Sequence, residues 1–188
     1  ENHKLRDETR QRLETRLAEF KPDIVCAHSL GSLVCYDSFS GSGASLIKGR
    51  CFVSCGSQIG NPFVIGNFAA GRLSGLPGAK FWYHLYNTED DVFTAKIKLS
   101  DANFAQIETY FDIPGPADHD VRQYMRHGRT SATVWSDALM ALHGNSLPRA
   151  RSTVVPASSK TDLTKWATST NKRALLVGIN HYPNSEQN

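Results

Sequence analysis

Short apolar runs bounded by turn residues recur along this chain, and they constrain its fold more than any other feature. The clearest are residues 24–27 (IVCA), 51–55 (CFVSC) and 81–86 (FWYHLY). None alternates apolar with polar residues, which is typical of strands buried on both faces of a parallel sheet. Helical patterns occupy 2–20, before the first run, and 33–39, between the first two. The alternation of strand and helix predicts a parallel α/β sheet flanked by helices.

The pattern continues more weakly towards the C-terminus. Residues 106–111 alternate like a fourth strand, which we expect near a sheet edge. Residues 120–143 predict one or two amphipathic helices. Six apolar side chains of these helices are expected to face inward: Val121, Tyr124, Met125, Val134, Leu139 and Leu142.

Composition excludes several classes of protein. The 188 residues include no run of about 18 apolar residues, so no membrane span is predicted. The net charge of +3 is not concentrated in a Lys/Arg tract, which gives nucleic-acid binding no support. Four cysteines, Cys26, Cys35, Cys51 and Cys55, lie in apolar runs rather than loops, so we expect buried thiols in a reducing cytoplasm. Their spacing matches no zinc motif, and no metal is expected.

The junction around Ser29 carries the strongest chemical signal. A buried strand ends just before His28, a helix begins near Leu30, and the small residues Ala27 and Gly31 flank the serine at two positions on either side. This arrangement is typical of a nucleophile elbow, G-x-S-x-G, with alanine in place of the first glycine. We therefore predict Ser29 as a nucleophile and the backbone N–H of Leu30 as an oxyanion donor. The alternative is an ordinary serine in a tight turn.

A serine nucleophile needs a base and an acid that orients it, and after such an elbow these follow in the order acid, then histidine. The third apolar run leads into Glu89, Asp90 and Asp91, and the residues alone do not decide among these acids. His119 lies in a loop after the fourth predicted strand and before the final helical region, which favours it as the base. His28 is expected to point away from the site. The alternative for His119 is a solvated loop residue.

These motifs together resemble a known family. Residues 23–127 are similar to lipase/esterase-like serine hydrolases of the α/β-hydrolase fold, through the AHSLGS elbow, the CGSQIGNP turn, the aromatic strand leading to the Asp90-Asp91-Val92 loop, and His119 followed by Tyr124. The resemblance implies a Ser29–Asp90–His119 triad, because it places the acid two residues before Val92. It implies an ester or lipid substrate and no cofactor. Gln58 stands where the family usually has proline.

The resemblance also bears on domain organisation. Residues 1–143 would form the C-terminal portion of a hydrolase domain, and the N-terminal half of its sheet is expected upstream or in a companion chain. Residues 144–171, rich in Ser and Thr with Pro148 and Pro156, predict a linker. The segment 172–188 contains ALLVGINHY, which resembles the opening strand of a caspase-like (metacaspase) domain.

Two functions follow as expectations. The first is hydrolysis of ester bonds by the triad, within a longer polypeptide that also carries a caspase-like protease. The second is a hydrolase-like regulatory or docking module whose output is proteolysis by the downstream domain. Phe63, Val64, Ile65 and Phe68 could form a lid or acyl wall, or belong to the core.

Overall fold

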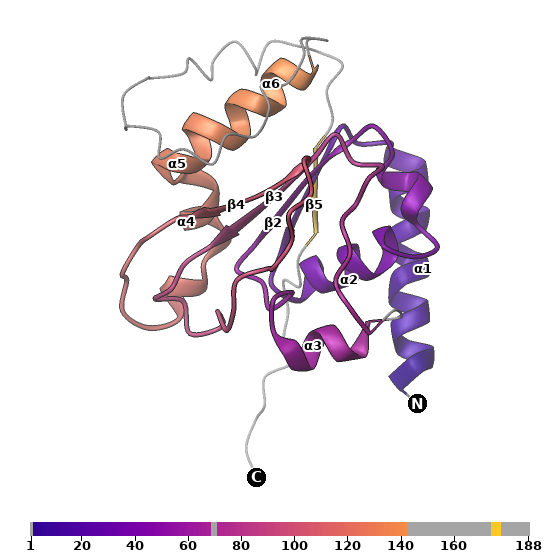
Figure 1. The fold of residues 1–188 in the computed structure, drawn as a ribbon, viewed down its shortest axis with the longest axis horizontal. Coiled ribbons are helices and arrows are strands. Elements are labelled where there is room, and N and C mark those ends of the chain that lie inside the picture. The colour runs from indigo at the N-terminus through magenta and orange to yellow at the C-terminus, as the bar shows by residue number, and fades with distance from the viewer. Residues whose placement is uncertain (1, 69–70, 143–173, 178–188) are drawn as a thin grey trace.

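A five-stranded parallel sheet forms the centre of the molecule. The computed structural model describes residues 2–68, 71–142 and 174–177 (Figure 1). The strands lie in the order β4-β3-β2-β1-β5. Their bounds are β1 Ile24–His28, β2 Cys51–Cys55, β3 Phe81–Tyr86, β4 Phe104–Glu108 and β5 Ala174–Val177.

Helices cover both faces of this sheet. On one face lie α1 (Asn2–Phe20), α2 (Leu30–Phe39), the 3₁₀ turn η1 (Ala44–Ile47) and α3 (Pro62–Asn67); on the other lie α4 (Val121–Arg126), α5 (Gly128–Thr130), a π-helical turn at Ser131–Trp135 and α6 (Ser136–Leu142) (Figure 1). A 3₁₀ turn, η2 (Gly115–His119), leads into α4.

Each face has its own apolar core. Leu17, Tyr36 and Phe52 represent the core beneath α1 and α2, whereas Val53 and Tyr124 represent the core beneath α4. Alternate residues of one strand, such as Phe52 and Val53, point to opposite faces, so burial of both faces requires the continuous apolar runs seen in the sequence.

Strand register aligns the ends of β1, β2 and β3. His28 pairs with Cys55, and Cys55 pairs with Leu85. The segments that follow these strands therefore emerge at the same carboxyl edge, which is where parallel α/β sheets build their sites.

Most sequence expectations for the elements are confirmed. The general α/β fold, the long first helix and the strands at 51–55 and 81–86 agree with prediction. The fourth strand lies at the sheet edge as expected, but it occupies Phe104–Glu108 rather than 106–111. Phe104 is buried and the other four residues of β4 are all partly buried, so the strand has no clear alternation between buried and exposed side chains. The sequence pattern therefore predicted its bounds poorly.

The C-terminal strand differs in its partner from the expectation. A strand is present at Ala174–Val177, but it pairs with β1 in the same sheet instead of opening a separate one. Residues 144–171, the predicted linker, lie outside the described residues, and so does everything after Val177. The domain boundaries stay a prediction.

The four cysteines are free and buried, as expected. Burial raises the pKa of the Cys26 and Cys51 thiols to about 12, so these sulfurs are neutral packing groups. Within the described part of the chain, no helix combines the length and apolar character that crossing a membrane requires.

Candidate active site

Ser29 occupies a strained turn between β1 and α2. Its φ of 51° and ψ of −129° place it in a region that L-residues rarely adopt. The turn is held because the Ser29 N–H donates to the carbonyl of Cys55 (3.0 Å), and the Ser32 N–H and hydroxyl both donate to the Ser29 carbonyl. Such strain persists only where its surroundings enforce it, and it is the backbone geometry expected of a nucleophile elbow.

Ser57, which follows β2, stabilises the same turn through Ser32. The Ser32 hydroxyl also contacts the Ser57 hydroxyl, which in turn accepts the N–H of Ile59 (3.2 Å). Ser32 and Ser57 are both buried, so this chain of bonds ties the turn after β1 to the turn after β2. Neither residue is among those that the sequence pattern predicts for the site.

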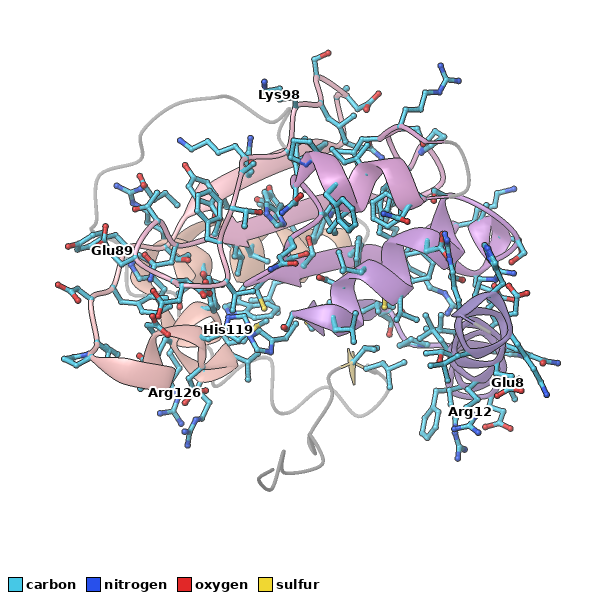
Figure 2. All side chains as sticks on the ribbon, turned by 90° about the horizontal axis from the view of Figure 1, so that it is seen from below. Glu8, Arg12, Glu89, Lys98, His119 and Arg126 are labelled. Carbon is cyan, nitrogen blue, oxygen red and sulfur yellow. The ribbon has the colours of Figure 1, made fainter. Side chains whose placement is uncertain are left out.

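The three consecutive acids after β3 have different environments. Glu89 and Asp91 are exposed, whereas Asp90 is 2% exposed. Figure 2 shows Glu89 at the periphery of the molecule, away from His119. The Asp91 N–H donates to the Asp118 carboxylate (3.4 Å), which holds the acid loop against the turn that carries His119. Only Asp90 among the three contacts His119, through the contact that the family spacing predicted.

His119 is bonded to Asp90 through one ring nitrogen. Nδ1 lies 2.8 Å from Oδ2 and 3.0 Å from Oδ1 of Asp90. An ionised carboxylate only accepts hydrogen bonds, so Nδ1 carries the proton and Nε2 of the neutral ring has a free lone pair. His119 Nε2 is buried without a hydrogen-bond partner among the described residues. The Ser29 hydroxyl is therefore not bonded to it here; such bonds often form only when substrate binds.

Asp90 is stabilised as a carboxylate. Burial by itself would raise its pKa, but hydrogen bonds from His119, the Tyr124 hydroxyl and the Val92 N–H outweigh burial and leave the pKa below its ordinary value. Burial, followed by the bond to Asp90, raises the pKa of Tyr124, which keeps its hydroxyl protonated as a donor. Asp90 is thus charged at neutral pH and fixed by three donors.

His28 does not point away from the site, contrary to expectation. Its ring centroid lies 4.5 Å from that of His119, with the ring planes at 39°. The register of β1 explains this, because alternate side chains put His28 on the same face as Ile24 and Cys26, the face covered by α4. The spacing of His28 from Ile24 and Cys26 was present in the sequence, but only the structure shows that this face lies against α4 and His119.

A small pocket opens beside the serine. It has a volume of about 250 Å³ and is lined by Ser29, Leu30, Leu33, Gln58 and Val92. The Leu30 side chain is 45% exposed at this opening. Its N–H lies in the first turn of α2, where backbone N–H groups have no partner within the helix.

Phe63, Val64, Ile65 and Phe68, expected to form either a lid or part of the core, differ in their exposure. Phe63 in α3 is 81% exposed, whereas Phe68 is 8% exposed and part of the core; Val64 and Ile65 are partly buried against it. Among the other histidines, His84 is buried inside β3 and His127 lies between α4 and α5 as the N-cap of α5, while His143 and His181 lie outside the described residues.

No group of three or more His, Cys, Asp or Glu side chains that could hold a metal ion occurs in the described ranges. In comparisons with known proteins, no protein-family model, curated protein or solved structure matches the chain.

Proposed function

We propose that this chain is a serine hydrolase of the α/β-hydrolase type that cleaves ester bonds, with Ser29 as nucleophile, His119 as general base and Asp90 as the orienting acid. The observation that carries the proposal is the bond from His119 Nδ1 to a buried, charged Asp90 at the sheet edge where the strained Ser29 lies. Acid, base and strained serine at one carboxyl edge are the parts that acyl transfer requires.

The mechanism follows from the protonation states. The Ser29 hydroxyl oxygen attacks the ester carbonyl while its proton passes to Nε2 of His119, and Asp90 stabilises the resulting imidazolium. The Leu30 N–H donates to the oxyanion of the tetrahedral intermediate. Collapse breaks the ester C–O bond as His119 returns the proton to the leaving alcohol. A water molecule, activated by the same nitrogen, then releases the acid and restores Ser29.

The pocket beside Ser29 supports a substrate with an apolar group. Leu30, Leu33 and Val92 offer aliphatic surface, and Gln58 is the one amide in the lining. A depression of about 250 Å³ beside the serine suits a short acyl group. A short acyl ester or the ester of a lipid is therefore the proposed substrate class.

The test is covalent labelling by a fluorophosphonate probe together with turnover of a short p-nitrophenyl ester. Ser29→Ala is expected to abolish labelling and to lower turnover by at least about 10³-fold. The matched control is Ser45→Ala, because Ser45 is an exposed serine in η1, remote in sequence from the turns that form the site. Undiminished turnover in Ser29→Ala, or a folded wild-type protein that neither labels nor turns over, would refute the proposal.

A second function is favoured by the pairing of β5. Val177, in the segment that resembles the opening of a caspase-like domain, pairs with Ala27, two residues before Ser29. We propose as the alternative that the hydrolase-like sheet docks or regulates such a downstream protease. A folded protein whose Ser29 is silent to the probe, and whose proteolytic output changes when β5 pairing is disrupted by Leu175→Pro, would favour this alternative.

A further inference from the structure

One face of the His119 ring is packed against another ring. His28 lies at a centroid distance of 4.5 Å from His119, and the Tyr124 ring centroid lies 6.4 Å from that of His28. His28 is the last residue of β1 and the immediate neighbour of Ser29. The ring that contacts His119 and the candidate nucleophile Ser29 therefore come from adjacent residues at the end of β1.

Gly56 lies next to both histidine rings. A Cβ at this position would lie 3.1 Å from Cε1 of His119 and 3.1 Å from Nε2 of His28, which is closer than ordinary van der Waals contact. Gly56 also has a φ of 51°, so a side chain here would be strained in addition. The two rings thus fill the space that a side chain at position 56 would need, and the His119 ring is held by Asp90 at Nδ1 and by His28 on one face.

His28 contributes its ring rather than a hydrogen bond through its outer nitrogen. Its Nε2 is buried and has no hydrogen-bond partner among the described residues. Burial and then the nearby charge of His119 lower the pKa of His28, while a hydrogen bond with the His119 backbone, followed by Asp90 and Asp120, opposes this. Tyr124 also faces it, and its raised pKa keeps it neutral. His28 is therefore an uncharged ring at neutral pH.

An uncharged neighbour suits a base that becomes positive during the reaction. When His119 accepts the serine proton, an aromatic ring at its face does not repel the new charge, whereas a protonated neighbour would. The close contact of the two rings also limits rotation of the His119 side chain.

We propose that His28 is a positioning residue for His119: it restricts rotation of the base so that Nε2 faces Ser29 while Nδ1 stays bonded to Asp90. The inference rests on the proposed function. It adds a residue that acts on the base through ring contact and not through the substrate.

The experiment compares His28→Phe and His28→Ala with the matched pair His3→Phe and His3→Ala, since His3 is an exposed histidine of α1. His28→Ala is expected to lower kcat about 10- to 100-fold with KM changed less than threefold, because misplacement of a catalytic group affects the transition state. His28→Phe keeps a ring and is expected to retain kcat within about fivefold. Equal kcat in wild type and His28→Ala, or a change confined to KM, would overturn the inference.

A second readout does not depend on activity. The proton on His119 Nδ1, bonded to Asp90, gives a downfield proton NMR signal that disappears in His119→Gln. In His28→Ala this proton is expected to exchange with water at least about tenfold faster, and the His3 variants leave it unchanged. If wild type neither labels nor turns over but exchange accelerates, the proposed function fails and the ring restraint stands. If turnover is normal and exchange does not change, the restraint fails; should His28→Phe not fold, His28→Ala with these two readouts decides.

Discussion

At the carboxyl edge of the sheet, His119 is bonded to Asp90 beside a partly exposed serine; in the middle of the same sheet, a second serine and histidine form a pair that reaches no solvent. Ser54 of β2 and His84 of β3 are register partners, and the Ser54 hydroxyl lies 3.0 Å from Nδ1 of His84. The interior pair thus has the serine–histidine bond that the edge site lacks in this structure.

The interior pair nevertheless has none of the other requirements for acyl transfer. Ser54 and His84 are both 0% exposed, and the remaining partner of the Ser54 hydroxyl is the indole N–H of Trp82 (2.9 Å). No carboxylate in the described part of the chain hydrogen-bonds to His84, and burial lowers its pKa to about 3, so it stays neutral. The comparison teaches that access, an orienting acid and a strained backbone distinguish the candidate site, whereas serine–histidine proximity does not.

The largest expected effect separates the acids of the edge site. Asp90→Asn should lower kcat/KM by about 10⁴-fold, because an amide at this position stabilises the wrong His119 tautomer. Asp91→Asn is the matched control and should cost less than about tenfold, since its side chain is exposed. Ester turnover of both variants measures this, and the reverse ranking would show that the acid is Asp91.

A smaller effect concerns the interior histidine and pH. Because the pKa of His84 is lowered in the folded protein, His84 is protonated in the unfolded chain at a higher pH than in the folded one. The stability that comes from neutral His84 is therefore complete above about pH 6.5 and is lost as the pH falls towards 3. At up to about 1.4 kcal/mol per pH unit, the free energy of unfolding should fall by about 2–3 kcal/mol between pH 6.5 and 4.5.

Denaturant unfolding of wild type and His84→Gln at both pH values measures this dependence. The variant should lose about 2 kcal/mol less than wild type over the range, because the other titrating groups are unchanged. Parallel pH dependences of the two proteins would show that His84 is not buried in neutral form.

The smallest expected effect is on the interior serine. Ser54→Ala leaves the Trp82 N–H and His84 Nδ1 without their shared partner, which should cost about 1–2 kcal/mol of unfolding free energy. Ester turnover per folded molecule should remain within about threefold of wild type, in contrast to Ser29→Ala. Loss of turnover in a folded Ser54→Ala protein would erase the distinction between the two regions.

The sequence indicated the candidate site residues but few of the contacts around them. Local turn patterns and the family resemblance point to Ser29, Asp90 and His119, whose catalytic roles stay a prediction. His28 was assigned the wrong direction, and Ser32, Ser57 and Tyr124 gave no sign of their hydrogen bonds. Those contacts join segments at least 25 residues apart, which no local pattern encodes.

The π-helical turn at Ser131–Trp135 and the short α3 also escaped prediction. Periodicity identified the region 120–143 as one or two helices, but it did not show that four short elements, α4, α5, the π-helical turn and α6, occupy it. Helical turns of this length have little stability of their own, so their bounds are set by what they pack against.

By itself the sequence determined the strands β1, β2 and β3, the helices α1 and α2, and the loops that carry the candidate acid and histidine, because continuous apolar runs and turn residues are local properties of the chain. Tertiary structure alone decided that β5 joins the sheet beside β1, that Tyr124 shares Asp90 with His119, and that His28 lies on the ring of the base. Each of these contacts depends on the register and packing of segments that are distant in sequence. Such contacts become favourable only when helices cover both faces of the sheet.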